Sequence, residues 1–191
     1  MIQETVVTTL DAAGRPHVAP MGLTLAAGAR PVLAPFRPSR TLDNLMARRS
    51  VVINYTDDVR VIAGCICGRH DWPTRPATSI EGAVLNAALA HAEAVVALVE
   101  DDPLRPRFHL DIVHEETHAP FRGLNRAKAA VVEAAVLVSR LHMLPAERVD
   151  AEMAHLAVAV GKTAGPEELE AWGWLQDHVA AWRARSRESA A

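Results

Sequence analysis

Hydrophobic and polar residues alternate with a period of two through most of the first half of the chain. Short β-rich runs at 4–10, 16–25 and 31–36 are separated by the turn-forming sequences DAAGR and AAGAR. This pattern predicts a meander of antiparallel strands. The runs at 92–100 and 107–115 flank the turn sequence DDPLRP and predict a long hairpin.

One segment of this β-rich half has helical spacing instead. Residues 37–49 place apolar side chains three and four positions apart after Pro38, which suits a first helical turn. They predict a helix of about three turns. The strand pattern resumes at 50–58, whereas the apolar run 59–68 is compatible with a buried strand or with a helix.

The second part of the chain has a helical pattern throughout. Residues 125–141 are apolar nearly all round at helical length, and two further amphipathic segments open at Pro145 and at Pro166. We therefore predict a β-rich domain over 1–122. A three-helix region over 123–191 follows it, and we expect it to pack on the β-rich domain or on a partner chain.

Composition and charge narrow the class of ligand. The net charge of −3 gives no electrostatic reason to expect nucleic acid or an anionic membrane as a partner. No apolar stretch reaches membrane-spanning length, and the N-terminus lacks the pattern of a signal peptide. Cys65 and Cys67 are too close together for a disulfide framework or a Cys-x-x-Cys motif. We expect a cytoplasmic protein that binds small molecules.

The sequence HEETH at 114–118 has the H-E-x-x-H spacing of zinc proteases, which depends on a helix that brings both histidines to one face. The preceding residues alternate as in a strand, and Pro120 prevents a helix from continuing. We interpret this segment as the end of a strand followed by a turn, and we assign no metal ligand.

A candidate anion site lies at 35–45, PFRPSRTLDNL. The first turn of the predicted helix would present unpaired amides and two hydroxyl groups, with an arginine on either side. The residues concerned are Arg37, Ser39, Arg40 and Thr41. Ordinary capping by the serine is an equally simple interpretation of the same residues. Arg122, Asn125 and Lys128 form a second candidate group near the start of the first C-terminal helix.

These motifs together resemble a known family. HVAPMGLTL, PVLAPFRPSRTLDNL and SVVINYTDD are similar to segments of the FMN-binding split-barrel superfamily, whose members include flavin reductases. ETVVTTL, APMG, RPSRT and RGLNRAKAAVVEAA resemble in particular the domain of unknown function 447 family. The resemblance covers residues 2 to about 141.

The resemblance implies a six-stranded antiparallel split β-barrel that forms a homodimer and binds FMN at the subunit interface. It assigns the flavin phosphate to Arg37, Ser39, Arg40 and Thr41, with Asn44 supporting the turn. The isoalloxazine ring would be lined by the backbone at Ala19, Met21, Gly22 and Thr24. Asn125 and Lys128 would reach the cofactor from the distal motif.

The function implied by the resemblance is that of an FMN-dependent oxidoreductase. Its substrate would be a flavin or pterin-like small molecule, with NADH or NADPH as donor, and relatives are associated with methanopterin-linked one-carbon metabolism. No side chain is required as an acid or nucleophile, because the flavin performs the redox chemistry. A flavin carrier or sensor without turnover is the alternative, and a zinc hydrolase using HEETH is a distant third.

Overall fold

The computed structural model describes residues 1–188 and divides into two compact units. The first unit consists of Met1–Asp57 and His70–Phe121, and the second consists of residues 58–69 together with the chain from Arg122 onward. The two domains predicted over 1–122 and 123–191 stay a prediction, and in the structure the short segment 58–69 belongs with the helices. The last three residues of the predicted C-terminal region lie outside the described residues.

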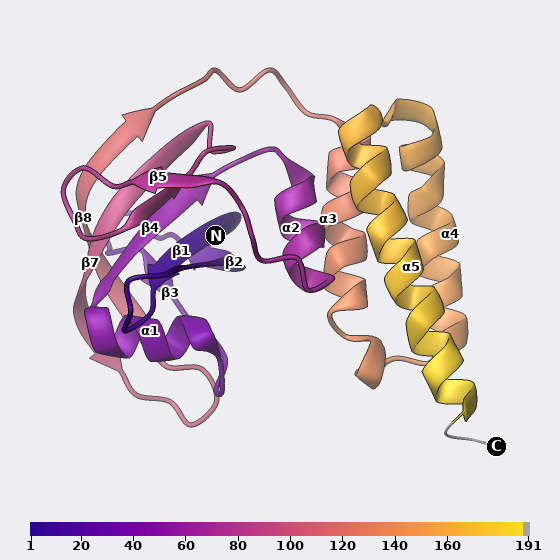
Figure 1. Cartoon of the computed structure of the whole chain (residues 1–191), viewed down its shortest axis with the longest axis horizontal. Coiled ribbons are helices and arrows are strands. Elements are labelled where there is room, and N and C mark those ends of the chain that lie inside the picture. Colours follow the sequence, from indigo (N-terminus) through magenta and orange to yellow (C-terminus); the bar gives the residue numbers. More distant parts are fainter. Residues whose placement is uncertain (189–191) are drawn as a thin grey trace. The chain divides into compact units, whose positions relative to one another are not determined.

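The first unit is a closed six-stranded barrel with the strand order β1-β2-β3-β8-β7-β4 (Figure 1). The strands are β1 (Ile2–Leu10), β2 (Pro16–Thr24), β3 (Val32–Leu33), β4 (Ser50–Tyr55), β7 (Ala90–Glu100) and β8 (Arg107–Thr117). All neighbouring strands are antiparallel. The fold class predicted from the resemblance is confirmed.

The hairpins of the barrel follow from local turn chemistry. Between β1 and β2, the Asp11 carboxylate accepts hydrogen bonds from the amides of Ala13 and Arg15, both at 2.9 Å, and Gly14 has a φ of 78°. Such an Asx turn followed by a left-handed glycine closes a tight hairpin without steric cost. The predicted hairpin of 92–100 and 107–115 is the β7–β8 pair.

The barrel is filled by the inward-facing residues of its strands. Phe108, Leu110, Leu23 and Leu33 are each fully buried in one cluster, and Leu45 joins them from the adjacent helix. That helix, α1 (Arg40–Arg48), begins two residues after Pro38, which the spacing placed in the first helical turn, and is followed by Arg49, whose φ of 54° is left-handed. Replacement of Phe108 by alanine would cost about 3–5 kcal/mol, the typical result of emptying a large core site.

A small hairpin covers part of the outer wall of the barrel. It consists of β5 (Thr74–Pro76) and β6 (Ala83–Leu85), and β6 packs against β1 and β4. The fully buried Asn54 joins the two layers: its amide donates to Val6 O at 3.0 Å and to Thr8 Oγ1 at 2.9 Å. Its carbonyl oxygen accepts the Leu85 amide at 2.8 Å.

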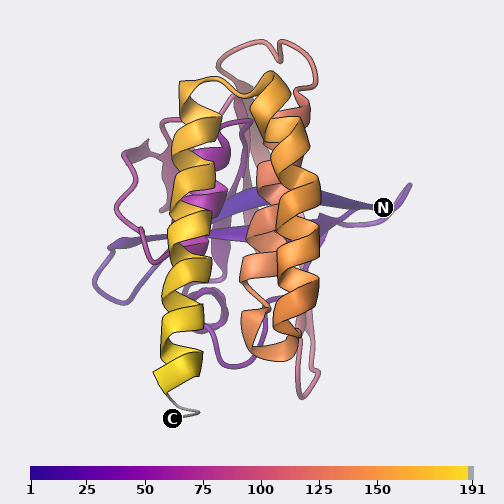
Figure 2. The ribbon, with the colours of Figure 1, turned by 90° about the vertical axis from the view of Figure 1, so that its right-hand side faces the viewer.

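The second unit is helical. It contains α2 (Val59–Ile66), α3 (Arg126–Val138), the short 3-10 turn η1 (Leu141–Met143), α4 (Ala146–Thr163) and α5 (Pro166–Glu188). Helix α3 packs against the other three helices, and Figure 2 shows α4 and α5 side by side. The three predicted C-terminal helices are present, and the ambiguous run 59–68 is the helix α2, capped by Asp58.

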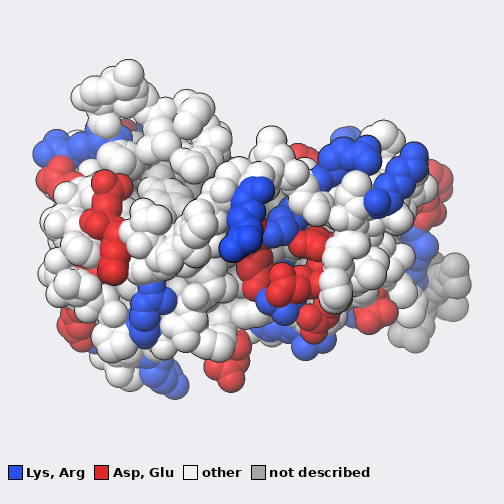
Figure 3. Space-filling view, turned by 90° about the horizontal axis from the view of Figure 1, so that it is seen from above, with Lys and Arg blue, Asp and Glu red and all other residues white. Residues whose placement is uncertain are grey.

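No helix within residues 1–188 is long and apolar enough to cross a membrane. On the face seen in Figure 3, basic and acidic side chains are interspersed. That view shows no extended surface of one sign, which agrees with the small net charge of −3.

Candidate functional site

The N-terminus of α1 has both the serine cap and the first-turn amides on which the predicted anion site depends. Ser39 is the N-cap, and its Oγ accepts the Leu42 amide at 3.2 Å. The amides of Arg40 and Thr41 occupy the first two helical positions, where no intrahelical acceptor exists. Capping therefore uses one donor and leaves two amides that could donate hydrogen bonds to a phosphate. The helix dipole also favours an anion at this end of the helix.

The two arginines that bracket this turn have different environments. Arg37 donates from Nη2 to Asp101 Oδ1 at 2.8 Å and from Nε to the Asp102 carbonyl at 3.2 Å. The side chain of Arg40 is exposed and makes no ion pair with any residue between 1 and 188. Arg40 is therefore the more available cation for an incoming phosphate, and Arg37 stabilises the β7–β8 turn.

His17 on β2 lies close to this turn. Sequence reasoning did not identify it as a site residue, because its spacing to the other histidines suggests no metal site. Its Nδ1 is buried and has no hydrogen-bond partner among the described residues. Burial lowers the pKa of His17, and the charge of Arg40 and the neighbouring His70 lower it further. An orphaned imidazole nitrogen in a cationic environment next to unpaired amides is a donor set that fits a phosphate group.

The four β2 residues predicted to line a flavin ring do not all face the same way. Ala19 and Met21 pack against the barrel core, and strand alternation places Gly22 and Thr24 on the opposite face. A Cβ on Gly22 would come within 2.9 Å of the Ile2 side chain. The Ile2 side chain therefore lies over Gly22 on this face, and contact of the β2 backbone with a flavin ring stays a prediction.

Asn44 and Thr41 fix the position of α1 on the barrel. The Asn44 amide donates to Thr9 Oγ1 at 2.9 Å, and both Asn44 and Thr41 are buried. Thr9 is the register partner of His17. The contact therefore places the first turn of α1 beside the part of β2 that carries His17, and the supporting role of Asn44 in a phosphate site stays a prediction.

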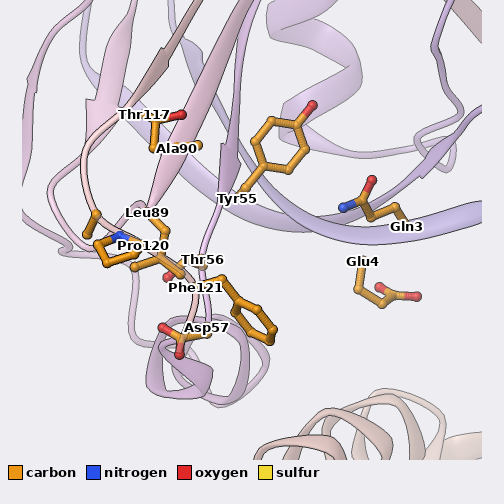
Figure 4. A pocket seen from close by; sticks show the side chains of 11 residues that line it. Gln3, Glu4, Tyr55, Thr56, Asp57, Leu89, Ala90, Thr117, Pro120 and Phe121 are labelled. Carbon is orange, nitrogen blue, oxygen red and sulfur yellow. The ribbon is translucent and has the colours of Figure 1, made fainter. Parts of the chain in front are cut away.

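A cavity of about 410 Å³ opens at the other end of β1. In Figure 4 the side chains of Tyr55, Phe121 and Gln3 surround the same open space. Glu4 also lines it and pairs with Gly22 in the β1–β2 register, so the cavity adjoins the glycine end of β2. Burial, followed by the charge of Glu115, raises the pKa of Tyr55, which keeps its phenol protonated as a hydrogen-bond donor. The volume suits a small organic ligand.

Asn125 and Lys128 have structural contacts within the helical unit. Asn125 is the N-cap of α3: its side chain accepts the Ala127 amide at 2.7 Å, and its own amide donates to the Thr163 carbonyl at 3.0 Å. The Lys128 ammonium lies 3.8 Å from a carboxylate oxygen of Glu168. Their contact with FMN stays a prediction.

The HEETH segment lies on a strand, as its alternation predicts. His114 to Thr117 are the last residues of β8, and His118 follows directly. Residues four apart on a strand are separated by about 13 Å along the backbone, so this segment lacks the helical geometry of a zinc protease. Cys65 and Cys67 lie at the end of α2, where burial raises the pKa of the Cys67 thiol.

The chain matches two adjoining family models. The model described as protein of unknown function (DUF447) N-terminal domain matches residues 3–119, and the model described as protein of unknown function (DUF447) matches residues 125–177. No curated protein matches the sequence.

Solved structures share the fold. An FMN-bound DUF447 protein from Methanosarcina mazei superposes with a TM-score of 0.80 at 19% identity, over 93% of this chain and 94% of that one. Nitrilotriacetate monooxygenase component B from Mycobacterium thermoresistibile has a TM-score of 0.53 at 17% identity, over 64% and 72%. The 2-nitrobenzoate 2-nitroreductase of Pseudomonas fluorescens has a TM-score of 0.51 at 20% identity, over 60% and 64%. The fold is that of flavin reductase-like proteins, and by its family matches the chain belongs to the DUF447 family.

Proposed function

We propose that this protein binds FMN and acts as an FMN-dependent oxidoreductase on a flavin, a pterin-like compound or a similar small molecule. The observation that carries the proposal is the first turn of α1, which presents the amides of Arg40 and Thr41 and the exposed Arg40 guanidinium, whose charge also acts on His17 with its orphaned Nδ1. The DUF447 relative of the same fold is described as FMN-bound, and several further neighbours are flavin reductases.

Each part of the site would contribute a different contact. The amides of Arg40 and Thr41, the Arg40 guanidinium and the His17 imidazole would hold the phosphate. The outer face of β2 at Gly22 and Thr24 would support the ring through its backbone. The barrel interior is filled by side chains, so the ring would lie outside it, where a second copy of the chain would cover it in the proposed homodimer.

When bound, FMN supplies the hydride or electron transfer, and the chain's own residues bind, orient and exclude water. The cavity beside Tyr55 and Phe121 is our candidate for the substrate position. Two aromatic rings there suit a flat heterocycle, and the Tyr55 hydroxyl would donate a hydrogen bond to it. A neighbour of the same fold is described as an NADH:FAD oxidoreductase, which makes NADH or NADPH the first donor to test.

The first test is the visible spectrum of the purified protein, before and after reconstitution with FMN. A yellow sample with one flavin per chain supports the proposal, and a colourless protein that fails to take up FMN contradicts it. Anaerobic mixing with NADH and NADPH then separates an enzyme from a carrier: rapid bleaching, followed by reoxidation with a flavin or pterin acceptor, is expected of an oxidoreductase. A bound flavin that no donor reduces would favour the carrier.

A further inference from the structure

A cluster of ionisable side chains lies on the outer face of the β7–β8 hairpin. His91 and Glu93 alternate along β7 on the face opposite to the core residues Ala92 and Ala94. His114 is the register partner of Glu93 on β8, and directly opposed residues place their side chains on one face. The strand pairing therefore brings two imidazoles and one carboxylate together.

Glu93 is fully buried, yet its carboxylate is held in the charged form. Oε1 accepts the Thr78 amide at 2.6 Å, and Oε2 accepts the amides of Ser79 and Ile80 at 2.6 and 3.0 Å. Burial opposes ionisation, but these amides and His91 outweigh it, and the pKa of Glu93 is lowered. A buried anion with fixed orientation is thus in place before any cation binds.

A chain of polar contacts leads from Arg75 through His118 and His91 to Glu93. Arg75 Nη2 lies 2.6 Å from His118 Nε2, and a guanidinium is always a donor, so this His118 nitrogen must accept. His91 Nδ1 lies 2.9 Å from the same nitrogen, whose single lone pair the guanidinium already uses. His91 Nε2 faces Glu93 Oε1 at 3.2 Å, and in the tautomer with the proton on Nδ1 it presents its lone pair there.

With the proton on Nε2, His91 donates to the Glu93 carboxylate, and a divalent ion can take the place of that proton between the two groups. The third donor, His114 Nε2, is buried and has no hydrogen-bond partner among the described residues, although a Glu116 carboxylate oxygen lies 3.8 Å away. The ligand atoms of His91, Glu93 and His114 all lie within 4.8 Å of one another. Two atoms bound to one zinc ion at a tetrahedral angle are about 3.3 Å apart, close to the His91–Glu93 separation.

We propose that His91 Nε2, Glu93 Oε1 and His114 Nε2 bind a divalent first-row transition-metal ion, with zinc as the preferred ion. Two imidazoles and one carboxylate leave a fourth coordination position for water. The partly exposed side chain of His114 leaves this position accessible to solvent. His118 and the backbone amides of 78–80 are the outer partners that fix the two buried ligands. The ion would join β7, β8 and the loop between β5 and β6.

The site uses one histidine of HEETH but not the pair that the motif suggests. His114 and His118 lie on either side of His91, with ring centroids 5.7 and 5.0 Å from it. His118 therefore orients His91 and does not join His114 on one ion. The signal in the sequence is the strand-spaced pair His91-x-Glu93, which requires the hairpin register to be recognised.

The test is zinc binding by the full-length chain after removal of metal with a chelator. Mass spectrometry of the dialysed protein and calorimetric titration should show one zinc per chain. His114→Gln should abolish this equivalent, and the exposed His155→Gln on α4 is the matched control that should retain it. His118→Gln should weaken binding by about 10- to 100-fold, as expected for an outer partner. No saturable equivalent in the wild type, or an equivalent unchanged in His114→Gln, would overturn the proposal.

A measurement on the unaltered protein guards against a variant that fails to fold. In ¹⁵N NMR spectra of the histidine rings, zinc should shift the Nε2 resonances of His91 and His114 and leave His155 unchanged. If the His91 nitrogens are both protonated and do not respond to zinc, a proton bridges His91 and Glu93, and the metal site is refuted.

Discussion

The sharpest consequence of the phosphate site concerns Arg40. Replacement by alanine removes the exposed cation at the start of α1 but leaves the Ser39 cap and the amides in place. A hydrogen bond to a charged group contributes about 1.5–3 kcal/mol, and solvent exposure of Arg40 favours the lower part of that range. We expect Arg40→Ala to cost about 1–2 kcal/mol, which weakens FMN binding roughly 5- to 30-fold.

The assay compares FMN with riboflavin, which lacks the phosphate. Quenching of flavin fluorescence gives both dissociation constants for the wild type and for Arg40→Ala, and the four values form a thermodynamic cycle. The loss should appear with FMN and be absent with riboflavin. Arg15→Ala, which removes an exposed arginine at the β1–β2 turn, is the matched control and should change neither constant. Equal losses for the two flavins, or an unchanged constant for FMN, would refute the placement of the phosphate.

Three further predictions follow from buried polar groups. Binding of FMN should raise the lowered pKa of His17, because a phosphate offsets the nearby cationic charge, so the affinity for FMN should fall as the pH rises through the raised pKa. Histidine NMR titrations with and without FMN measure the pKa of His17. A pKa that does not change on FMN binding contradicts the prediction. Asn54→Ala should lower the free energy of unfolding by about 2–4 kcal/mol, since the buried Leu85 amide loses its acceptor. The control Asn86→Ala, at an exposed position, should change this free energy little. Urea denaturation of both variants measures the difference. Glu93→Gln should destabilise at neutral pH, but the gap to the wild type should close as the pH falls below the ordinary glutamate value of 4.5. A gap that stays constant down to pH 3 would show that the charge of Glu93 contributes nothing.

Local patterns predicted most of the barrel, because each strand and turn is encoded within a few residues. The period of two, the Asx turn at Asp11 and the DDPLRP turn sufficed for β1, β2, β7 and β8. The run 59–68 was ambiguous because it is apolar except for Arg60, and so short a run shows no periodicity that separates a helix from a strand. Closure of the barrel by β1 on β4 and by β3 on β8 joins distant segments, and only the family resemblance predicted it.

In the candidate site too, the sequence predicted the local features but not the contacts between distant segments. The Ser39 cap is a local feature, and it lies where the sequence places it. The ion pair of Arg37 with Asp101 spans 64 residues, and the sequence offers no signal for it. His17 and the His91–Glu93–His114 group depend on strand register and on which face is covered, so single-residue spacing along the chain could not reveal them.

The β5–β6 hairpin is attached to the barrel through its main chain. Asn54 and Glu93 reach out from the wall and bind the amides of Leu85, Thr78, Ser79 and Ile80, which every residue type except proline possesses. Homologues should therefore tolerate varied side chains at the exposed Thr78 and Ser79, whereas the fully buried Leu85 should stay apolar. They should not tolerate a proline there, nor an insertion or deletion that moves an amide away from its acceptor. Within this family, the length of the segment 77–85 should therefore be more strongly conserved than its amino-acid sequence.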